Sequence, residues 1–176
     1  MNKVTLKSSM DMLQSVSLIL GMAFICFQVY NMSRSYRADQ MVKSADFVMK
    51  ISEELRKARY DKITNAIQDH DGKYPILATK VHQGFPEHLL DEYLGNFETL
   101  GNLVKDGVIT KKMAYNELSY DVEAAWSNED VRRFIRDQRK ENKVRDREDA
   151  FYTGFEYLAR ECFKQDGKPL PGLDKE

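Results

Sequence analysis

The feature that most constrains this chain is an uncharged run near its amino terminus, MLQSVSLILGMAFICFQVYNMS, which extends from Met12 to Ser33. A helix of that length spans about 33 Å, close to the roughly 30 Å hydrocarbon core of a bilayer. The middle of the run, LILGMAFICF, is apolar all the way round, whereas a helix packed in a water-soluble core normally keeps a polar side. We therefore predict a single transmembrane helix over 12–33, preceded by a short tail over 1–11.

A helix buried in a soluble core is one alternative interpretation of this run, and a cleaved signal peptide is the other. Cleavage needs a pair of small residues shortly after the apolar stretch, and the following CFQVYNMSRSY offers no convincing pair. We therefore expect an uncleaved anchor. Basic residues flank it on both sides, with only a slight excess after it, at Arg34, Arg37 and Lys43.

Cysteine usage agrees with a reducing compartment. Cys26 lies inside the predicted membrane helix and Cys162 near the other end of the chain, so we expect no disulfide within the domain. Together with the slight charge bias, this predicts that the bulk of the chain is cytoplasmic.

The remainder of the chain carries helix signals almost throughout. Apolar residues recur at spacings of three, four and seven after Ala38, and no proline or glycine lies between Arg34 and Asp71. We predict a long juxtamembrane helix over 34–68, a helical bundle core over 69–164 and a disordered tail over 165–176. The fold class is all-α, with a single amino-terminal transmembrane helix followed by about four to six helices.

Local signals mark several ends of these helices. Gly107 is expected to adopt a left-handed conformation at the end of one helix, and Thr110 to cap the start of the next. Ser127, with Asp130 three residues later, resembles a cap at the start of a third.

A family resemblance is carried by YLGNFETLGNLVKDGVITKKMAYNEL and by the later REDAFYTGFEYLARE. These stretches resemble a bacterial group, the 4760 family of domains of unknown function, whose members often follow one or two membrane segments. The matching positions are helix-packing residues: Asn96, Phe97, Glu98, Leu100, Gly107, Ile109, Trp126, Tyr152, Phe155, Glu156 and Leu158. The resemblance implies an anchored helical domain in a bacterium, hence at the inner membrane, and it implies no enzyme activity.

Three sets of residues are candidates for function. A polar interhelix cluster is predicted at Asn96, Glu98 and Glu156, because the helices that carry these residues should pack together. A basic face, which could meet lipid headgroups or a partner, is predicted at Arg132, Arg136, Arg139, Lys140 and Lys143; a solvated face with internal ion pairs is the alternative. In the membrane helix, Ser17 and Gly21 form a small-xxx-small pair that would let two copies pair as a homodimer.

Enzyme chemistry has little support in the sequence. No zinc-binding pattern, phosphate-binding loop or nucleophile elbow is present, and we expect no metal or cofactor. Seven basic and two acidic residues lie between Val131 and Arg145. The single aromatic residue there, Phe134, belongs to the apolar pattern of Val131 and Ile135, so no aromatic stacking residues interleave with the basic ones and no nucleic acid is expected.

The sequence therefore favours a membrane-anchored protein-interaction or scaffolding module, with membrane lipid and an unidentified protein as partners. A membrane-perturbing effector of a phage-defence or toxin-like system is one alternative. A hydrolase without a recognisable motif is a further one.

Overall fold

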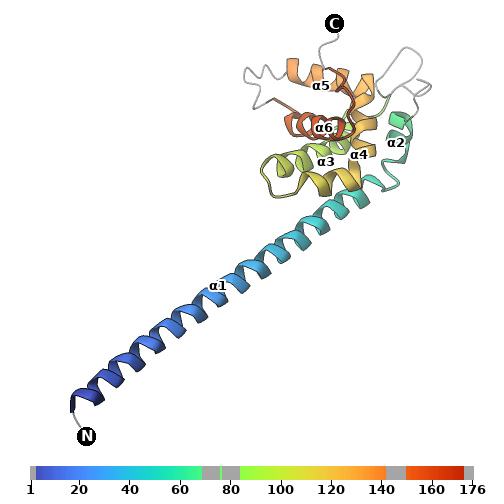
Figure 1. Cartoon of the computed structure of the whole chain (residues 1–176). Coiled ribbons are helices and arrows are strands. Elements are labelled where there is room, and N and C mark those ends of the chain that lie inside the picture. Colours follow the sequence, from blue (N-terminus) through green and yellow to red (C-terminus); the bar gives the residue numbers. More distant parts are fainter. Residues whose placement is uncertain (1–2, 69–75, 77–83, 142–149, 173–176) are drawn as a thin grey trace. The chain divides into compact units, whose positions relative to one another are not determined.

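The structure is a computed structural model that describes residues 3–68, 76, 84–141 and 150–172, with side chains from Val16 onward. It divides into two units, Met1–Lys43 and Ser44–Glu176, and each is described by itself. All the regular secondary structure in the described residues is α-helical, which confirms the predicted fold class (Figure 1).

Helix α1, Lys3–Leu55, contains the predicted membrane segment. It is long and apolar enough to cross a membrane, and its most apolar part is not buried by any other described part of the chain. The single apolar helix near the amino terminus is therefore present as predicted.

The predicted juxtamembrane helix over 34–68 is broken in the structure. Helix α1 ends at Leu55, and α2, Asp61–Gln68, begins after a turn in which the Tyr60 amide donates to the carbonyl of Lys57 at 2.8 Å. Burial of the Tyr60 ring, which meets the edge of Tyr93 with centroids 5.5 Å apart, accounts for the turn.

The bundle also begins earlier than the predicted boundary at 69. The last turns of α1 contribute Val48, Ile51 and Leu55 to the same buried core as the later helices. Their spacing of three and four places them on one side of the helix. The boundary was wrong because a helix-wide apolar pattern does not tell where burial against a bundle starts.

Helices α3, Glu87–Lys105, and α4, Lys111–Ser127, are separated by a short turn. Gly107 adopts a left-handed φ of 74°, and the Thr110 side chain accepts a hydrogen bond from the Met113 amide at 3.2 Å, as predicted. Helix α5, Glu129–Glu141, is capped by Asn128 rather than by Ser127, because α4 continues through Ser127. The Asn128 carboxamide oxygen accepts from the amides of Asp130 at 3.0 Å and Val131 at 3.3 Å.

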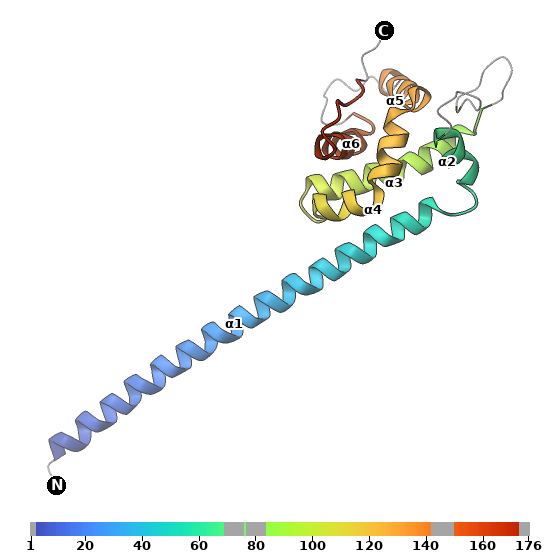
Figure 2. The same ribbon diagram turned by 45° about the vertical axis from the view of Figure 1, so that its right-hand side comes forward.

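Helix α6, Thr153–Gln165, packs against α3 and α4 (Figure 2). Aromatic rings form a continuous path through this contact. The Tyr93 and Phe97 rings meet edge to face at 5.3 Å, Phe97 stacks on Phe155 at 5.1 Å, and Trp126 meets Phe155 edge on at 5.1 Å. These fully buried rings make the α3–α4–α6 contact the centre of the bundle.

Two glycines let α3 and α6 approach closely. A Cβ added to Gly101 would lie 1.9 Å from the Gly154 carbonyl oxygen, and one added to Gly154 would lie 2.5 Å from the Glu98 carbonyl oxygen. No larger residue fits either position without moving a backbone.

The predicted disordered tail over 165–176 is ordered as far as it is described. The Trp126 indole N–H donates to the carbonyl of Pro171 at 3.0 Å, and Leu170 packs against the core. Lys168 pairs with Glu123 at 2.7 Å. A buried indole needs a hydrogen-bond acceptor, and the chain after α6 supplies it; residues 173–176 lie outside the described part.

Candidate functional site

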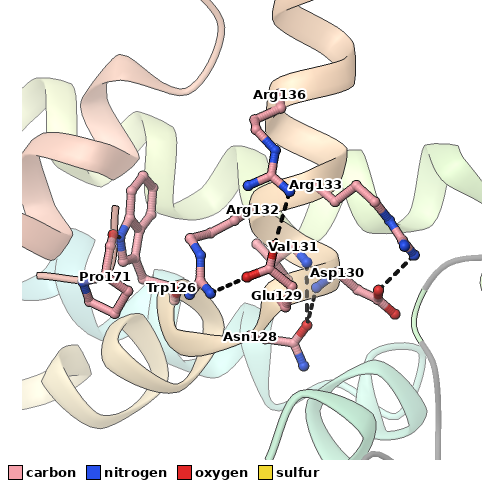
Figure 3. Close-up of polar contacts among 9 residues, drawn as sticks. All are labelled: Trp126, Asn128, Glu129, Asp130, Val131, Arg132, Arg133, Arg136 and Pro171. Carbon is pink, nitrogen blue, oxygen red and sulfur yellow. Dashed lines mark hydrogen bonds and ion pairs between the residues drawn. The ribbon is translucent and has the colours of Figure 1, made fainter. Parts of the chain in front are cut away.

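Arg132 and Arg136 of the predicted basic face point toward Glu129 of their own domain (Figure 3). Arg132 is 8% exposed, donates to the Trp126 carbonyl at 2.7 Å and pairs with Glu129. Arg136 reaches the other oxygen of Glu129 at 2.9 Å. Hydrogen bonds from Arg136 and then Arg132 hold the pKa of Glu129 below its ordinary value, against the opposing effect of its partial burial.

The neighbouring pair extends this network. Arg133 binds Asp130 at 2.7 Å (Figure 3). The second carboxylate oxygen of Asp130 accepts from the Ile76 amide at 3.0 Å. Asp130 therefore links α5 to a backbone group 54 residues earlier in the chain. Ionic groups at this corner fix the path of the chain between α4 and α5.

The remaining members of the predicted basic face differ in their surroundings. Arg139 donates to the Phe151 carbonyl at 2.7 Å and, through both terminal nitrogens, to one oxygen of Glu156 at 3.1 Å. Lys140 is exposed, and Lys143 lies outside the described residues. Three of the five predicted residues are thus bound within the domain. This arrangement matches the alternative of internal ion pairs, and not a free basic surface, for these three arginines.

The predicted polar cluster is divided among separate contacts. Asn96 donates to the carbonyl of Glu92 at 2.9 Å, within its own helix. Glu98 extends from α3 and accepts from the Phe155 amide at 2.8 Å, which caps the first turn of α6. Glu156 lies in that same turn and binds Arg139 and Arg160.

Glu98 and Glu156 therefore share a place, the start of α6, but have different partners. Both put negative charge near the positive end of the helix dipole, which favours the helix. Glu98 joins α3 to α6, and Glu156 joins α5 to α6. The two carboxylates act as structural links between three helices.

Tyr152 marks the turn before α6. It is the only non-glycine residue with positive φ among those described, at 62°, and its buried hydroxyl donates to the Asp91 carboxylate. Burial first, and then the hydrogen bond to Asp91, raise the pKa of Tyr152, so its hydroxyl stays protonated near neutral pH.

A polar groove of about 420 Å³ lies beside this turn. Its lining includes acidic, amide, basic and hydroxyl side chains, namely Asp91, Glu98, Asn102, Lys105, Tyr152 and Thr153. Both acids already accept hydrogen bonds from α6 or from the turn before it. Phe151 lies at the groove with 44% of its surface exposed, so an apolar contact is also available there.

Helix α1 places the two residues of the predicted helix–helix contact on an open surface. Ser17 is exposed, and a Cβ added to Gly21 would meet nothing within 4 Å in the described chain. The apolar neighbours Leu18, Ile19 and Leu20 are 64–65% exposed. The described part of the protein leaves this stretch uncovered.

Groups that could carry enzyme chemistry have structural surroundings. Burial raises the pKa of the Cys162 thiol to about 12, so the nucleophilic thiolate is scarce at neutral pH. Within the described residues, no group of three or more His, Cys, Asp and Glu side chains is arranged to hold a metal ion. His88 is exposed at the start of α3, whereas His70 and His82 lie outside the described part.

The fold and these contacts define an all-α bundle carried by a helix that is suited to crossing a membrane. No protein-family model, curated protein or solved structure matches the chain. The resemblance to the 4760 family of domains of unknown function stays a prediction.

Proposed function

We propose that this chain is a single-pass membrane protein whose helical bundle is a protein-interaction module held at the membrane surface. The observation that carries the proposal is that no part of the apolar stretch of α1 is buried, whereas the bundle has a buried core of its own. Apolar side chains left uncovered over such a length require another covering, and lipid tails fit both the length and the composition.

Residues at the carboxyl end of the stretch suit a membrane–water boundary. Tyr30 and Tyr36 are exposed aromatic residues, and Arg34 and Arg37 lie between and beside them. Tyrosine is enriched at bilayer interfaces, and basic residues near a helix end reach the headgroups. This arrangement supports a boundary near residues 30–37, with the bundle on the water side.

The contacts at the start of α6 support an interaction role over a catalytic one. Glu98, Glu156 and Arg139 join α3, α5 and α6 into one rigid unit, so these charged groups have structural partners. A bundle whose charged groups are engaged in its own structure leaves its outer surface as the part that can meet a partner. The resemblance to the 4760 family is in keeping with this role.

We further propose a bacterial inner membrane and a cytoplasmic bundle. Support comes from the small excess of basic residues after the apolar stretch, and from Cys162, a buried free thiol that suits a reducing compartment. Protease treatment of right-side-out spheroplasts tests the orientation. The bundle should survive until the cells are lysed, and digestion in intact spheroplasts would reverse the assignment.

Substitution of Ile19 by Arg tests the membrane placement. An arginine at the centre of a membrane helix costs about 2.5–3.5 kcal/mol of insertion free energy. Tyr120→Arg is the matched control, because Tyr120 on α4 is 66% exposed and Ile19 is 64% exposed. Ile19→Arg should release chain from carbonate-washed membranes, and more so when combined with Met22→Arg, whereas Tyr120→Arg should not. Equal behaviour of the two single variants would overturn the proposal.

A further inference from the structure

One stripe along α1 gathers most of the polar side chains of the apolar stretch. Of the four Ser, Asn and Gln residues between Val16 and Ser33, three recur in a single pattern of alternating spacings of three and four. The same pattern includes a glycine and continues beyond the stretch with small and apolar residues. The α1 stripe consists of Ser17, Gly21, Phe24, Gln28, Asn31, Ser35, Ala38 and Val42, all exposed in the structure.

Polar amides on this stripe need a partner if lipid surrounds the helix. Gln28 precedes by two residues, or about 3 Å along the helix axis, the boundary proposed above near residues 30–37. Lipid tails themselves offer no hydrogen bond on this side of the boundary, whereas Gln28 of a second copy, at the same depth, offers both a donor and an acceptor. Gly21, one heptad earlier, lets two backbones approach closely.

The same spacing persists where the helix enters water. A repeat of three and four is the seam of a left-handed pair of helices, and Ala38 and Val42 continue it after Ser35. Val42 is 68% exposed, so a second helix at this seam would cover an apolar side chain that the described chain leaves open.

Charges beside the seam select a parallel partner of the same sequence. With Ser35 and Val42 at position a, Arg34 falls at position g and Asp39 at the following position e. In parallel two-stranded coils, the g residue of one helix faces the next e residue of the other, so Arg34 would meet Asp39 of the second copy twice by symmetry. Asp39 also pairs with Lys43 of its own helix at 2.7 Å. Two copies inserted in the same direction are necessarily parallel.

We propose that the partner of this module is a second copy of the chain, bound in parallel through the α1 stripe from Ser17 to Val42. The inference rests on the membrane placement proposed above. It names one occupant for an exposed face, and it assigns Gln28 and Asn31 to hydrogen bonds between copies, Gly21 to close approach, and Arg34 with Asp39 to register.

Cysteine cross-linking of the full chain in membranes tests the proposal. In a Cys26→Ser background, Ala38→Cys places a thiol on the stripe, and Gln40→Cys places one on the opposite side of the same exposed turn. Disulfides need Cα atoms about 4.4–6.8 Å apart, a separation that only the seam position offers. Mild oxidation should convert Ala38→Cys to a species of twice the 20.5 kDa chain mass, and leave Gln40→Cys as monomer.

Each outcome has a separate meaning. A chain absent from washed membranes overturns the membrane placement. If the chain is in the membrane and the two variants cross-link equally, not at all, or to a protein of different mass, the second copy is overturned. Such results leave the anchor intact, so the failures of the two proposals are distinguishable.

A charge exchange tests the register. In the Ala38→Cys chain, Arg34→Asp alone and Asp39→Arg alone place like charges across the seam and should each reduce the yield of cross-linked dimer. The double exchange restores opposite charges and should recover the yield. A double variant no better than the single ones would contradict the parallel register, because a merely local effect of either residue would not be rescued.

Discussion

Replacement of Gly101 by alanine should separate α3 from α6. The added Cβ would lie 1.9 Å from the Gly154 carbonyl oxygen, 2.3 Å from its carbon and 3.0 Å from its Cα, all backbone atoms. Ordinary contact needs at least roughly 3.4 Å, so the helices must move apart by more than about 1 Å and loosen the Phe97–Phe155 stack. Overpacking of this kind costs about 1–3 kcal/mol of unfolding free energy, and we expect the upper end because no side chain can yield.

Gly95→Ala is the matched control on the same helix. A Cβ there meets nothing within 4 Å, so the variant should gain about 1 kcal/mol from helix propensity. Denaturant unfolding of the full chain in detergent micelles, followed by helical circular dichroism, should separate the two variants by about 2–4 kcal/mol. Equal or greater stability of Gly101→Ala would refute the close α3–α6 contact.

Three further predictions concern other contacts of the bundle. Glu98→Ala removes the carboxylate that caps α6 and should lower the unfolding free energy by about 1–2 kcal/mol, with Glu98→Gln intermediate because its amide oxygen can still accept; denaturant titration measures both. Deletion of residues 169–176 removes the acceptor of the Trp126 indole and should shift the emission of this sole tryptophan to the red; unchanged emission would contradict the described tail. Burial raises the pKa of Cys162 from 9.0 to about 12, so the folded state holds the thiol proton more tightly than the unfolded state does. The contribution of this proton to the free energy of unfolding is therefore complete below pH 9 and declines as pH rises toward 12. Cys162→Ala lacks the thiol, so its unfolding midpoint should fall less steeply over that pH range than that of the unsubstituted chain.

Much of the fold could be predicted because its signals are local. Gly107 and Thr110 act through their own turn, so residue type and position alone indicate a helix end and a helix start. The apolar run of α1 depends only on length and absence of charge. The error at Ser127 is of the same local kind, since the neighbouring Asn128 is an equally good cap and tertiary packing decided between them.

The contact between α3 and α6 could not be predicted from its residues. Gly101 and Gly154 look like ordinary helix glycines until the two helices are placed together. Tyr152 carries no sequence signal for positive φ, because its conformation is held by burial and by the bond to Asp91. These features depend on residues about 50 to 60 positions apart, which periodicity does not relate.

The predicted functional sites also combine features that the sequence shows locally with contacts that depend on distant residues. Arg132, Arg136, Arg139 and Lys140 of the predicted basic face lie on one helix, α5, but the acids that bind the three arginines lie at the start of that helix or in α6. Charge counting along a sequence cannot tell an arginine that faces solvent from one that faces a carboxylate of its own domain.

Labelling of Cys26 tests the central claim, that lipid covers α1, most directly. Cys26 is exposed in the structure, so the described chain does not protect it. Gln40 lies two heptads along the same side of α1, which makes Gln40→Cys in a Cys26→Ser chain the matched control. In inverted membrane vesicles, which expose the cytoplasmic side, a charged maleimide should label Gln40→Cys and leave Cys26 unlabelled until detergent is added. Labelling of Cys26 at the rate of the control would show that water, not lipid, surrounds this helix.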